Sequence, residues 1–254
     1  LAATQGGGAY LRGDSLRAKS VFHVNPSYGS GGGAMVEYAG RLSDCLFTNN
    51  AAQVGGGVRV QHTGIVEACD FDGNMAADHG GGAYVSVHGL VSNCTFRWNI
   101  ATNGGAVAVS DAGLVTHSTM LSNNVYLSGG GALLAGTVEP GSLLHSDLID
   151  NFAGESGGGL AGSVCLVSNC LISGNVTHGD GGGIAASPGG HLVSPAQIRS
   201  SRVLDNHAHG SGGGGFFPNA LVSGCEFSGN VASNYGGGAW CWKSSLTNLT
   251  VTGN

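Results

Sequence analysis

The sequence predicts an all-β protein: a parallel β-helix, which is a solenoid, with about ten rungs of ~24 residues each. Three observations predict it. An asparagine returns about every two dozen residues, a bulky apolar residue precedes it by three positions, and glycines follow it by five to seven positions. Such a rung has no room for an ordinary helix beside strands and turns, and the apolar residues show no 3.6-residue period. Solenoid units bury their apolar faces only by stacking, so the repeat defines the fold.

The asparagine column runs through the whole chain. Its members follow one another at intervals of 24 or 25 residues, apart from two longer intervals of 28 and 31. Asparagine tolerates the left-handed conformation of turns, and stacked side-chain amides form ladders of hydrogen bonds. We therefore expect each asparagine to adopt that conformation at a turn and to bond to the asparagine of the next rung. The column contains Asn25, Asn50, Asn74, Asn99, Asn123, Asn151, Asn175, Asn206, Asn230 and Asn254.

Two further columns predict the interior of the solenoid. Residues three and five positions before the asparagine share one side of a strand, so a large and a small side chain point inward together. We expect two or three strands in each rung. The large column contains Phe22, Phe47, Phe71, Phe96, Met120, Leu148, Ile172, Val203, Phe227 and Val251. The small column contains Ser20, Cys45, Cys69, Cys94, Ser118, Ser146, Cys170, Ser201, Cys225 and Leu249.

Five of the seven cysteines belong to the small column and would stack one rung above the next. Disulfides between neighbours such as Cys45, Cys69 and Cys94 are sterically conceivable at ~5 Å between Cα atoms. Free interior thiols are favoured, because serine takes the same place in other rungs. The sequence has no Cys-x-x-Cys pair, which disfavours a zinc site built from these cysteines.

The paired motifs of the repeat, Gly-Gly-(Gly)-Ala and Phe-x-x-Asn, resemble the GGA(I/L/V) and FxxN repeats of the polymorphic outer membrane proteins (Pmp). The resemblance covers the whole chain, and a third glycine is its main departure. It implies a single-stranded, right-handed parallel β-helix that is extracellular or exposed on a cell surface, often adhesive, and it implies no catalytic residue. The second motif is literal at Phe22, Phe47, Phe71, Phe96 and Phe227, and alanine follows glycine at Ala9, Ala34, Ala83, Ala106, Ala132 and Ala239.

Composition narrows the function further. The formal charge of −6, with 9 lysines and arginines in total, disfavours nucleic acid, which is bound by clustered basic residues. No basic segment with a following apolar run opens the chain, and no apolar stretch reaches membrane-spanning length, so we expect no membrane span in this segment.

The period runs through residues 1–254 without a change in composition, which predicts one continuous β-helix domain. The first rung starts in its middle and no polar cap is recognisable at either end. Solenoids need caps for solubility, so we expect a segment of a longer chain or ends covered by neighbouring chains.

The densest set of ionisable residues lies in three successive turns between the asparagine and the glycines. Equivalent turns of a solenoid lie along one edge, so these side chains are expected within about 10 Å of each other. Such a set is a weak candidate for a metal site or an acid/base pair, against the simpler interpretation of polar residues in exposed turns. The set contains Glu155, His178, Asp180, His207 and His209.

Two rungs carry insertions, around residues 137–140 and 187–200, and insertions often map to a binding edge. The longer one supplies His191 and Arg199. An arginine beside a carboxylate such as Glu139 or Glu155 is a weak candidate for lyase chemistry, which abstracts a proton next to a uronate. No row of aspartates that would hold Ca²⁺ is visible, and no cofactor is expected.

We therefore expect an extracellular structural or adhesive module, at a cell surface or in a filament, without catalysis. Its partners would be other copies of itself, flanking modules of the parent chain, or host or matrix glycans and proteins. The alternative is a polysaccharide lyase or glycoside hydrolase of the pectate-lyase-like β-helix class. Three sequons mark glycosylation acceptors for a eukaryotic secretory pathway, at Asn93, Asn175 and Asn248.

Overall fold

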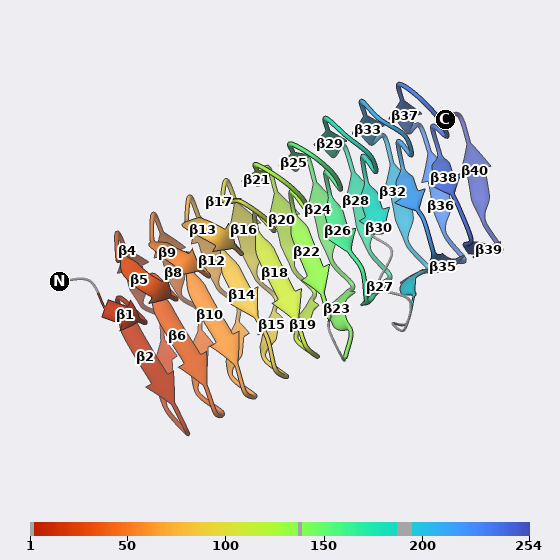
Figure 1. Cartoon of the computed structure of the whole chain (residues 1–254). Coiled ribbons are helices and arrows are strands. Elements are labelled where there is room, and N and C mark those ends of the chain that lie inside the picture. Colours follow the sequence, from red (N-terminus) through yellow and green to blue (C-terminus); the bar gives the residue numbers. More distant parts are fainter. Residues whose placement is uncertain (1–2, 137–138, 187–194) are drawn as a thin grey trace.

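The computed structural model describes residues 3–136, 139–186 and 195–254. Over these residues the chain forms ten rungs of four short strands each, stacked along one axis, with the two termini at opposite ends (Figure 1). This confirms the predicted all-β parallel solenoid and its number of rungs. In the described ranges, no helix is present and hence none that is long and apolar enough to cross a membrane.

Each rung gives one strand to each of four parallel ten-stranded sheets, which we name A to D in chain order. Sheet A contains β1 (Ala3–Gln5), β5 (Ser27–Ser30), β9 (Ala51–Val54), β13 (Met75–His79), β17 (Ile100–Ala101), β21 (Asn124–Val125), β25 (Phe152–Ala153), β29 (Val176–Thr177), β33 (His207–Ala208) and β37 (Val231–Ala232). Sheet B contains β2 (Ala9–Arg12), β6 (Ala34–Glu37), β10 (Val58–Gln61), β14 (Ala83–Val85), β18 (Val107–Ser110), β22 (Ala132–Ala135), β26 (Leu160–Gly162), β30 (Ile184–Ala186), β34 (Gly215–Phe217) and β38 (Ala239–Cys241).

The other two sheets follow in the same order along each rung. Sheet C contains β3 (Leu16–Ala18), β7 (Arg41–Ser43), β11 (Ile65–Glu67), β15 (Leu90–Ser92), β19 (Leu114–Thr116), β23 (Gly141–Leu144), β27 (Cys165–Ser168), β31 (Ala196–Arg199), β35 (Ala220–Ser223) and β39 (Ser245–Thr247). Sheet D contains β4 (Val21–His23), β8 (Leu46–Thr48), β12 (Asp70–Asp72), β16 (Thr95–Arg97), β20 (Thr119–Leu121), β24 (Asp147–Ile149), β28 (Leu171–Ser173), β32 (Arg202–Leu204), β36 (Glu226–Ser228) and β40 (Thr250–Thr252).

The prediction of two or three strands per rung was wrong, because each rung has an extra corner. Residues six and one positions before the column asparagine adopt the left-handed conformation, as at Asp44 (φ 52°) and Asn49 (φ 53°). The first of these ends the sheet C strand and the second ends the sheet D strand. The small column therefore lies at the corner between sheets C and D, where Cys45 still points inward beside Phe47.

The column asparagines form an unbroken ladder, but they do not take the left-handed conformation themselves. The preceding residue makes the bend, which aims each asparagine into the wall. At every step the backbone N–H and Nδ2 of one asparagine donate to Oδ1 of the next at 2.8–3.0 Å. From the second rung on, Nδ2 also donates to a carbonyl of the large column in the preceding rung.

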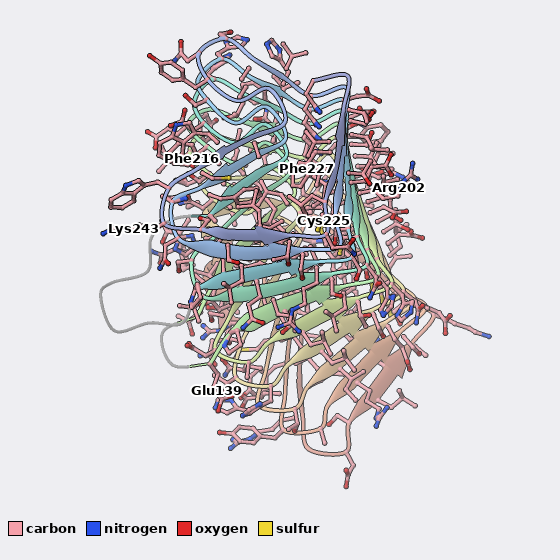
Figure 2. The ribbon with its side chains drawn as sticks, turned by 90° about the vertical axis from the view of Figure 1, so that its right-hand side faces the viewer. Glu139, Arg202, Phe216, Cys225, Phe227 and Lys243 are labelled. Atoms are coloured by element: carbon pink, nitrogen blue, oxygen red, sulfur yellow. The ribbon has the colours of Figure 1, made fainter. Side chains whose placement is uncertain are left out.

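The main core lies between sheets B, C and D, and a smaller apolar cluster lies under sheet A. In the main core, four phenylalanine rings from Phe22 to Phe96 stack along the solenoid axis, with centroids 4.5–4.6 Å apart. Figure 2, viewed from the end that carries the C-terminus, shows Phe227 and Cys225 inside the wall and Arg202 outside it.

The small column is a second ladder as well as part of the core. The backbone N–H of Cys45 donates to Sγ of Cys69, and that of Cys94 donates to Oγ of Ser118. All seven cysteines are free, and all except Cys241 are buried. A hydroxyl and a thiol both accept this hydrogen bond, which explains why either serine or cysteine can occupy the column.

Each of the three glycines of a rung is required for a different reason, as the second rung shows. Gly31 has a φ of +63°, which favours glycine. A Cβ on Gly32 would approach the carbonyl oxygen of Ala51 to 2.6 Å, and a Cβ on Gly33 would lie 2.6 Å from Cδ1 of Phe47. The close stacking of neighbouring backbones therefore depends on all three positions.

The fifth rung departs from this pattern in a paired way. Ala106 replaces the third glycine there, and Met120 replaces phenylalanine in the same rung. In the fourth rung, a Cβ on Gly82 would lie 2.5 Å from Cδ1 of Phe96. A flexible thioether side chain can avoid a methyl group that a phenyl ring at this position would meet, which accounts for the pairing.

The three sequons occupy two different environments. Asn175 belongs to the ladder and is fully buried, with Nδ2 donating to Leu148 and Asn206. Asn93 and Asn248 lie at the exposed corner between sheets C and D. The ladder therefore withholds Asn175 from glycosylation in the folded protein.

Candidate functional site

The predicted set of ionisable residues lies along the corner between sheets A and B, in three successive rungs. The ring of His178 stacks on that of His209 with centroids 5.2 Å apart, and His207 meets His209 edge to face at 4.9 Å. Asp180 accepts a hydrogen bond of 2.6 Å from the backbone N–H of Ser211. The structure thus brings the three histidines into contact.

These contacts do not create a ligand set for a metal ion. The stacked faces of His178 and His209 keep their ring nitrogens from converging, and one Asp180 oxygen already serves the backbone. Over the described ranges, no three histidine, cysteine, aspartate or glutamate side chains are grouped so that they could hold a metal. The metal interpretation of this set rests on sequence alone.

The residues considered for lyase chemistry lie on separate parts of the molecule. Glu155 is exposed in the turn between β25 and β26, at the corner of sheets A and B, whereas Arg199 ends β31 in sheet C and bonds to Gln197. Glu139 precedes β23, so it and Arg199 lie at opposite ends of sheet C strands, on the order of 15–20 Å apart by strand geometry. No carboxylate and arginine pair is assembled from these three.

Both insertions fall between a sheet B strand and the following sheet C strand. Thr137, Val138 and residues 187–194, which include His191, lie outside the described residues. The insertions therefore enter at the corner between sheets B and C, and the histidines lie at the corner between sheets A and B. The two insertions therefore share one edge of the solenoid, and the histidines lie at another.

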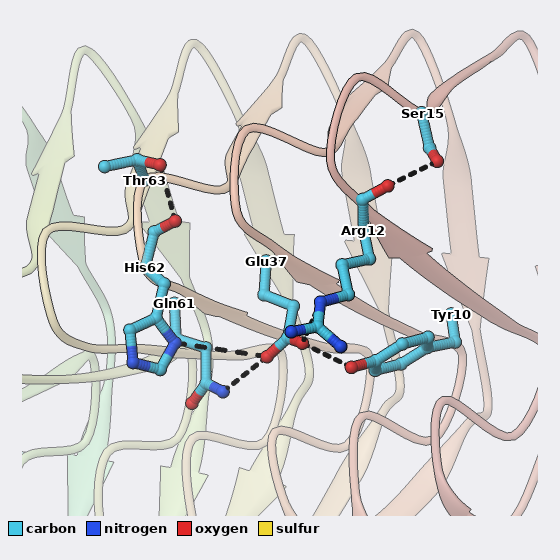
Figure 3. Close-up of polar contacts among 7 residues, drawn as sticks. All are labelled: Tyr10, Arg12, Ser15, Glu37, Gln61, His62 and Thr63. Atoms are coloured by element: carbon cyan, nitrogen blue, oxygen red, sulfur yellow. Dashed lines mark hydrogen bonds and ion pairs between the residues drawn. The ribbon is translucent and has the colours of Figure 1, made fainter.

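A polar cluster that the sequence reasoning missed lies at the outer side of sheet B in the first three rungs (Figure 3). Glu37, only 5% exposed, accepts hydrogen bonds from the hydroxyl of Tyr10 and from Nε2 of Gln61, the latter at 2.8 Å. Nε of Arg12 lies 3.5 Å from one carboxylate oxygen of Glu37, and Nδ1 of His62 lies 3.9 Å from the other.

The charge of Glu37 is stabilised by these neighbours. Burial alone would raise the pKa of this carboxyl. The hydrogen bonds from Tyr10 and Gln61 outweigh that effect and lower the pKa below its ordinary value, and the charges of Arg12 and His62 act in the same direction. The hydrogen bond to Glu37 in turn raises the pKa of the Tyr10 hydroxyl. A carboxyl that stays ionised cannot donate a proton near neutral pH, so Glu37 is suited to hold its neighbours in place.

An aromatic stack covers this cluster. The ring of Tyr38 lies parallel to that of His62 with centroids 4.6 Å apart, and the guanidinium of Arg12 sits 4.7 Å from the centroid of Tyr38. The rung repeat explains both contacts, because these residues occupy nearly equivalent positions in the first three rungs. Aligning the rungs in register would have revealed Arg12, Glu37 and Gln61 as one column of opposite charge and amide.

The outer face of sheet A is a row of side chains that runs along the stack from the second rung to the tenth. We define it as the residues one and three positions after each column asparagine; the intervening residues point inward. None of its eighteen described positions is aspartate, glutamate, lysine or arginine. Large side chains such as Ile100 and Val231 are exposed on it. The face contains Pro26, Tyr28, Ala51, Gln53, Met75, Ala77, Ile100, Thr102, Asn124, Tyr126, Phe152, Gly154, Val176, His178, His207, His209, Val231 and Ser233.

On the outer faces of sheets B and D, ionisable and aromatic side chains contact their counterparts in neighbouring rungs. On sheet D, Arg202 and Glu226 form an ion pair of 2.9 Å between neighbouring rungs. On sheet B, Phe216 stacks on Trp240 with centroids 4.4 Å apart, on the opposite side from Arg202 (Figure 2).

No protein-family model and no curated protein sequence matches the chain. Among solved structures, it is similar to the crystal structure of a TibC-catalyzed hyper-glycosylated TibA fragment (residues 55–350), with 16% sequence identity over 94% of each chain and a TM-score of 0.27.

Proposed function

We propose that the chain is a non-catalytic extracellular module that presents the outer face of sheet A to its binding partners at a cell surface. The observation that carries this proposal is the uncharged character of that face. Uncharged, partly apolar surface is cheap to desolvate, whereas charged side chains are depleted at the centres of protein interfaces. At about 4.8 Å per rung, the nine rungs of this face extend it over roughly 40 Å.

The hydrogen-bonded ladders inside the solenoid also support the proposal. The asparagine amides and the interior thiols and hydroxyls are used to join rungs, which gives a stiff support for an exposed face. The repeat resemblance supports the extracellular location. Matrix or host proteins and glycans are the expected partners, and further copies or flanking modules of the parent chain would extend the stack.

The first test is adhesion with a changed face. Purified chain is captured on a sensor, and binding is measured to fibronectin, laminin and collagen and to intact epithelial cells. We expect binding that drops at least tenfold in a variant with Ile100→Lys and Val231→Lys, because buried lysines would have to be desolvated. Leu46→Lys is the control: Leu46 on sheet D and Ile100 are both 38% exposed.

Two results would overturn the proposal: no binding to any of these surfaces, or equal losses in the sheet A and sheet D variants. Negative-stain electron microscopy of the same material tests the assembly part separately. End-to-end filaments would support self-stacking, and isolated rods at high concentration would exclude it.

A further inference from the structure

A shallow groove interrupts the outer face of sheet A in the second to fourth rungs. Its volume is 710 Å³, within the range of ~300–1,000 Å³ that is usual for ligand sites. Pro26, Ala51 and Ala77 form an apolar floor, and Tyr28 and Gln53 rise from neighbouring strands. Tyr28 is 73% exposed, so its ring is available for stacking.

Two irregularities in the strands shape this groove. Tyr28 lies in β5 where two residues oppose one of β1, between the paired positions Ser27 and Ser30. Asp78 lies in β13 where two residues again oppose one, here Gln53 of β9. Such bulges re-aim side chains and are frequent next to binding and active sites. Both flank the rung of Gln53.

The polar residues of the lining are Ser27 and Gln53, and Gln53 pairs with the carboxylate of Asp78, which lies beside the groove. Nε2 of Gln53 donates to Oδ2 of Asp78 at 2.9 Å, and in the described part of the chain this is the one hydrogen bond of the Gln53 side chain. Oε1 and the second amide hydrogen of Gln53 remain to serve a ligand, and a carboxylate accepts several hydrogen bonds. The described lining contains no lysine or arginine to attract an anionic ligand, and Asp78 beside the groove would repel one.

We propose that this groove binds a neutral saccharide. The apolar face of a pyranose ring would stack on Tyr28, and its hydroxyl groups would donate to Asp78 and exchange hydrogen bonds with Gln53. The proposal deepens the adhesive function and rests on it: it names one ligand class and one place on the outer face of sheet A.

The chain supplies a matched control for the aromatic part. Tyr126 has the same position in its rung and the same 73% exposure as Tyr28. Its neighbours in that column are Thr102, whose hydroxyl donates to the carbonyl of Ala77 at 2.6 Å, and Gly154. Tyr126 therefore has an equivalent ring without an amide and carboxylate pair beside it in the column.

The experiment is saturation-transfer NMR on the purified chain with lactose, maltotriose and mannotriose, and with a hyaluronate tetrasaccharide as the acidic comparison. We expect transfer to at least one neutral saccharide and none to hyaluronate. Isothermal titration should then show about fivefold weaker binding for Tyr28→Ala and for Gln53→Ala, the size of one lost contact. Tyr126→Ala should stay within about twofold of the parent protein.

The proposal is overturned if no neutral saccharide receives saturation, if hyaluronate binds more tightly, or if Tyr126→Ala loses as much as Tyr28→Ala. Asp78→Asn removes the charge and retains the size, so it should weaken neutral binding and relieve the exclusion of hyaluronate. Both tyrosines are exposed, and unchanged melting curves show that the variants are folded. If the parent protein adheres to matrix proteins but binds no saccharide, only the saccharide proposal is refuted. If it does neither, the proposed adhesive function is refuted as well.

Discussion

Replacing Asn99 by alanine should be among the most destabilising single substitutions in the chain. Asn99 is fully buried in the ladder. Its Oδ1 accepts from the backbone N–H and from Nδ2 of Asn74, and its Nδ2 donates to the carbonyl of Phe71 and to Oδ1 of Asn123, all at 3.0 Å. Alanine removes these four hydrogen bonds and leaves the rung otherwise closed.

The expected loss follows from the groups left behind. Two donors of Asn74 lose their acceptor in a wall that water does not reach, and each orphaned buried donor costs about 1–3 kcal/mol. We therefore expect the free energy of unfolding to fall by about 2–6 kcal/mol, against about 0.5 kcal/mol or less for an exposed site. Asn124→Ala is the control, because Asn124 is exposed on the outer face of sheet A.

Guanidinium unfolding followed by circular dichroism measures this difference, and hydrogen exchange locates it. The backbone N–H of Asn74 should exchange much faster in Asn99→Ala than in the parent protein. Asn99→Asp retains an acceptor for that N–H, so it should protect it better than alanine does. A loss below about 1 kcal/mol, or a loss no larger than in the Asn124 control, would refute the contribution of the ladder.

Three further outcomes are expected. Met120→Phe should cost about 1–3 kcal/mol by crowding Ala106, and Ala106→Gly should reverse that cost; simple additivity of the two changes would refute the pairing. Because the pKa of Glu37 is lowered from 4.5, its ionised form stabilises the fold above that pH, and this contribution is lost as pH falls from there through the folded-state pKa. Glu37→Gln should therefore show less loss of melting temperature between about pH 5 and pH 2 than the parent protein, and identical slopes would contradict this. In the native state only Cys241 should react with a thiol reagent, because the other thiols are buried. Burial also raises the pKa of Cys165 to about 12 and that of Cys170 to about 11. Mass spectrometry after denaturation should count seven labels, and fewer would indicate a disulfide.

The stack could be predicted from the sequence because its inner columns tolerate few residue types. An amide such as that of Asn50 is needed to donate and accept at once, and a ring such as Phe47 fills the space that a glycine leaves. The extra corners could not be read in the same way. The residue that bends the chain before each asparagine is as diverse as Val24, Trp98 and Asp205, because backbone hydrogen bonds between rungs hold it there.

The candidate sites were harder to predict because their members meet only through stacking. The residues around Glu37 come from three rungs and form no motif along the chain. The bulges beside Gln53 did leave a trace. The first glycine of the Gly-Gly-Gly motif follows the asparagine by six residues in the rungs of Tyr28 and Asp78, and by five in the rung of Gln53. The spacing alone does not say which side chains become neighbours. The strand register, which only the structure gives, brings Tyr28 close to Gln53 and Asp78.

The asparagine ladder also has a direction. Each asparagine presents two donors toward the following rung, and the next asparagine brings the single oxygen that accepts both. A chain that emerges from its N-terminus therefore ends, after every completed rung, in an asparagine that lacks the acceptor oxygen of the next one; in the last rung Nδ2 of Asn254 donates to the carbonyl of Thr252 instead. A new rung that docks out of register would bury a donor without its asparagine acceptor, at about 1–3 kcal/mol for each orphaned donor. When the stack grows in this direction, the ladder hydrogen bonds thus penalise every rung that is added out of register. Packing of interchangeable apolar side chains alone would not impose this penalty.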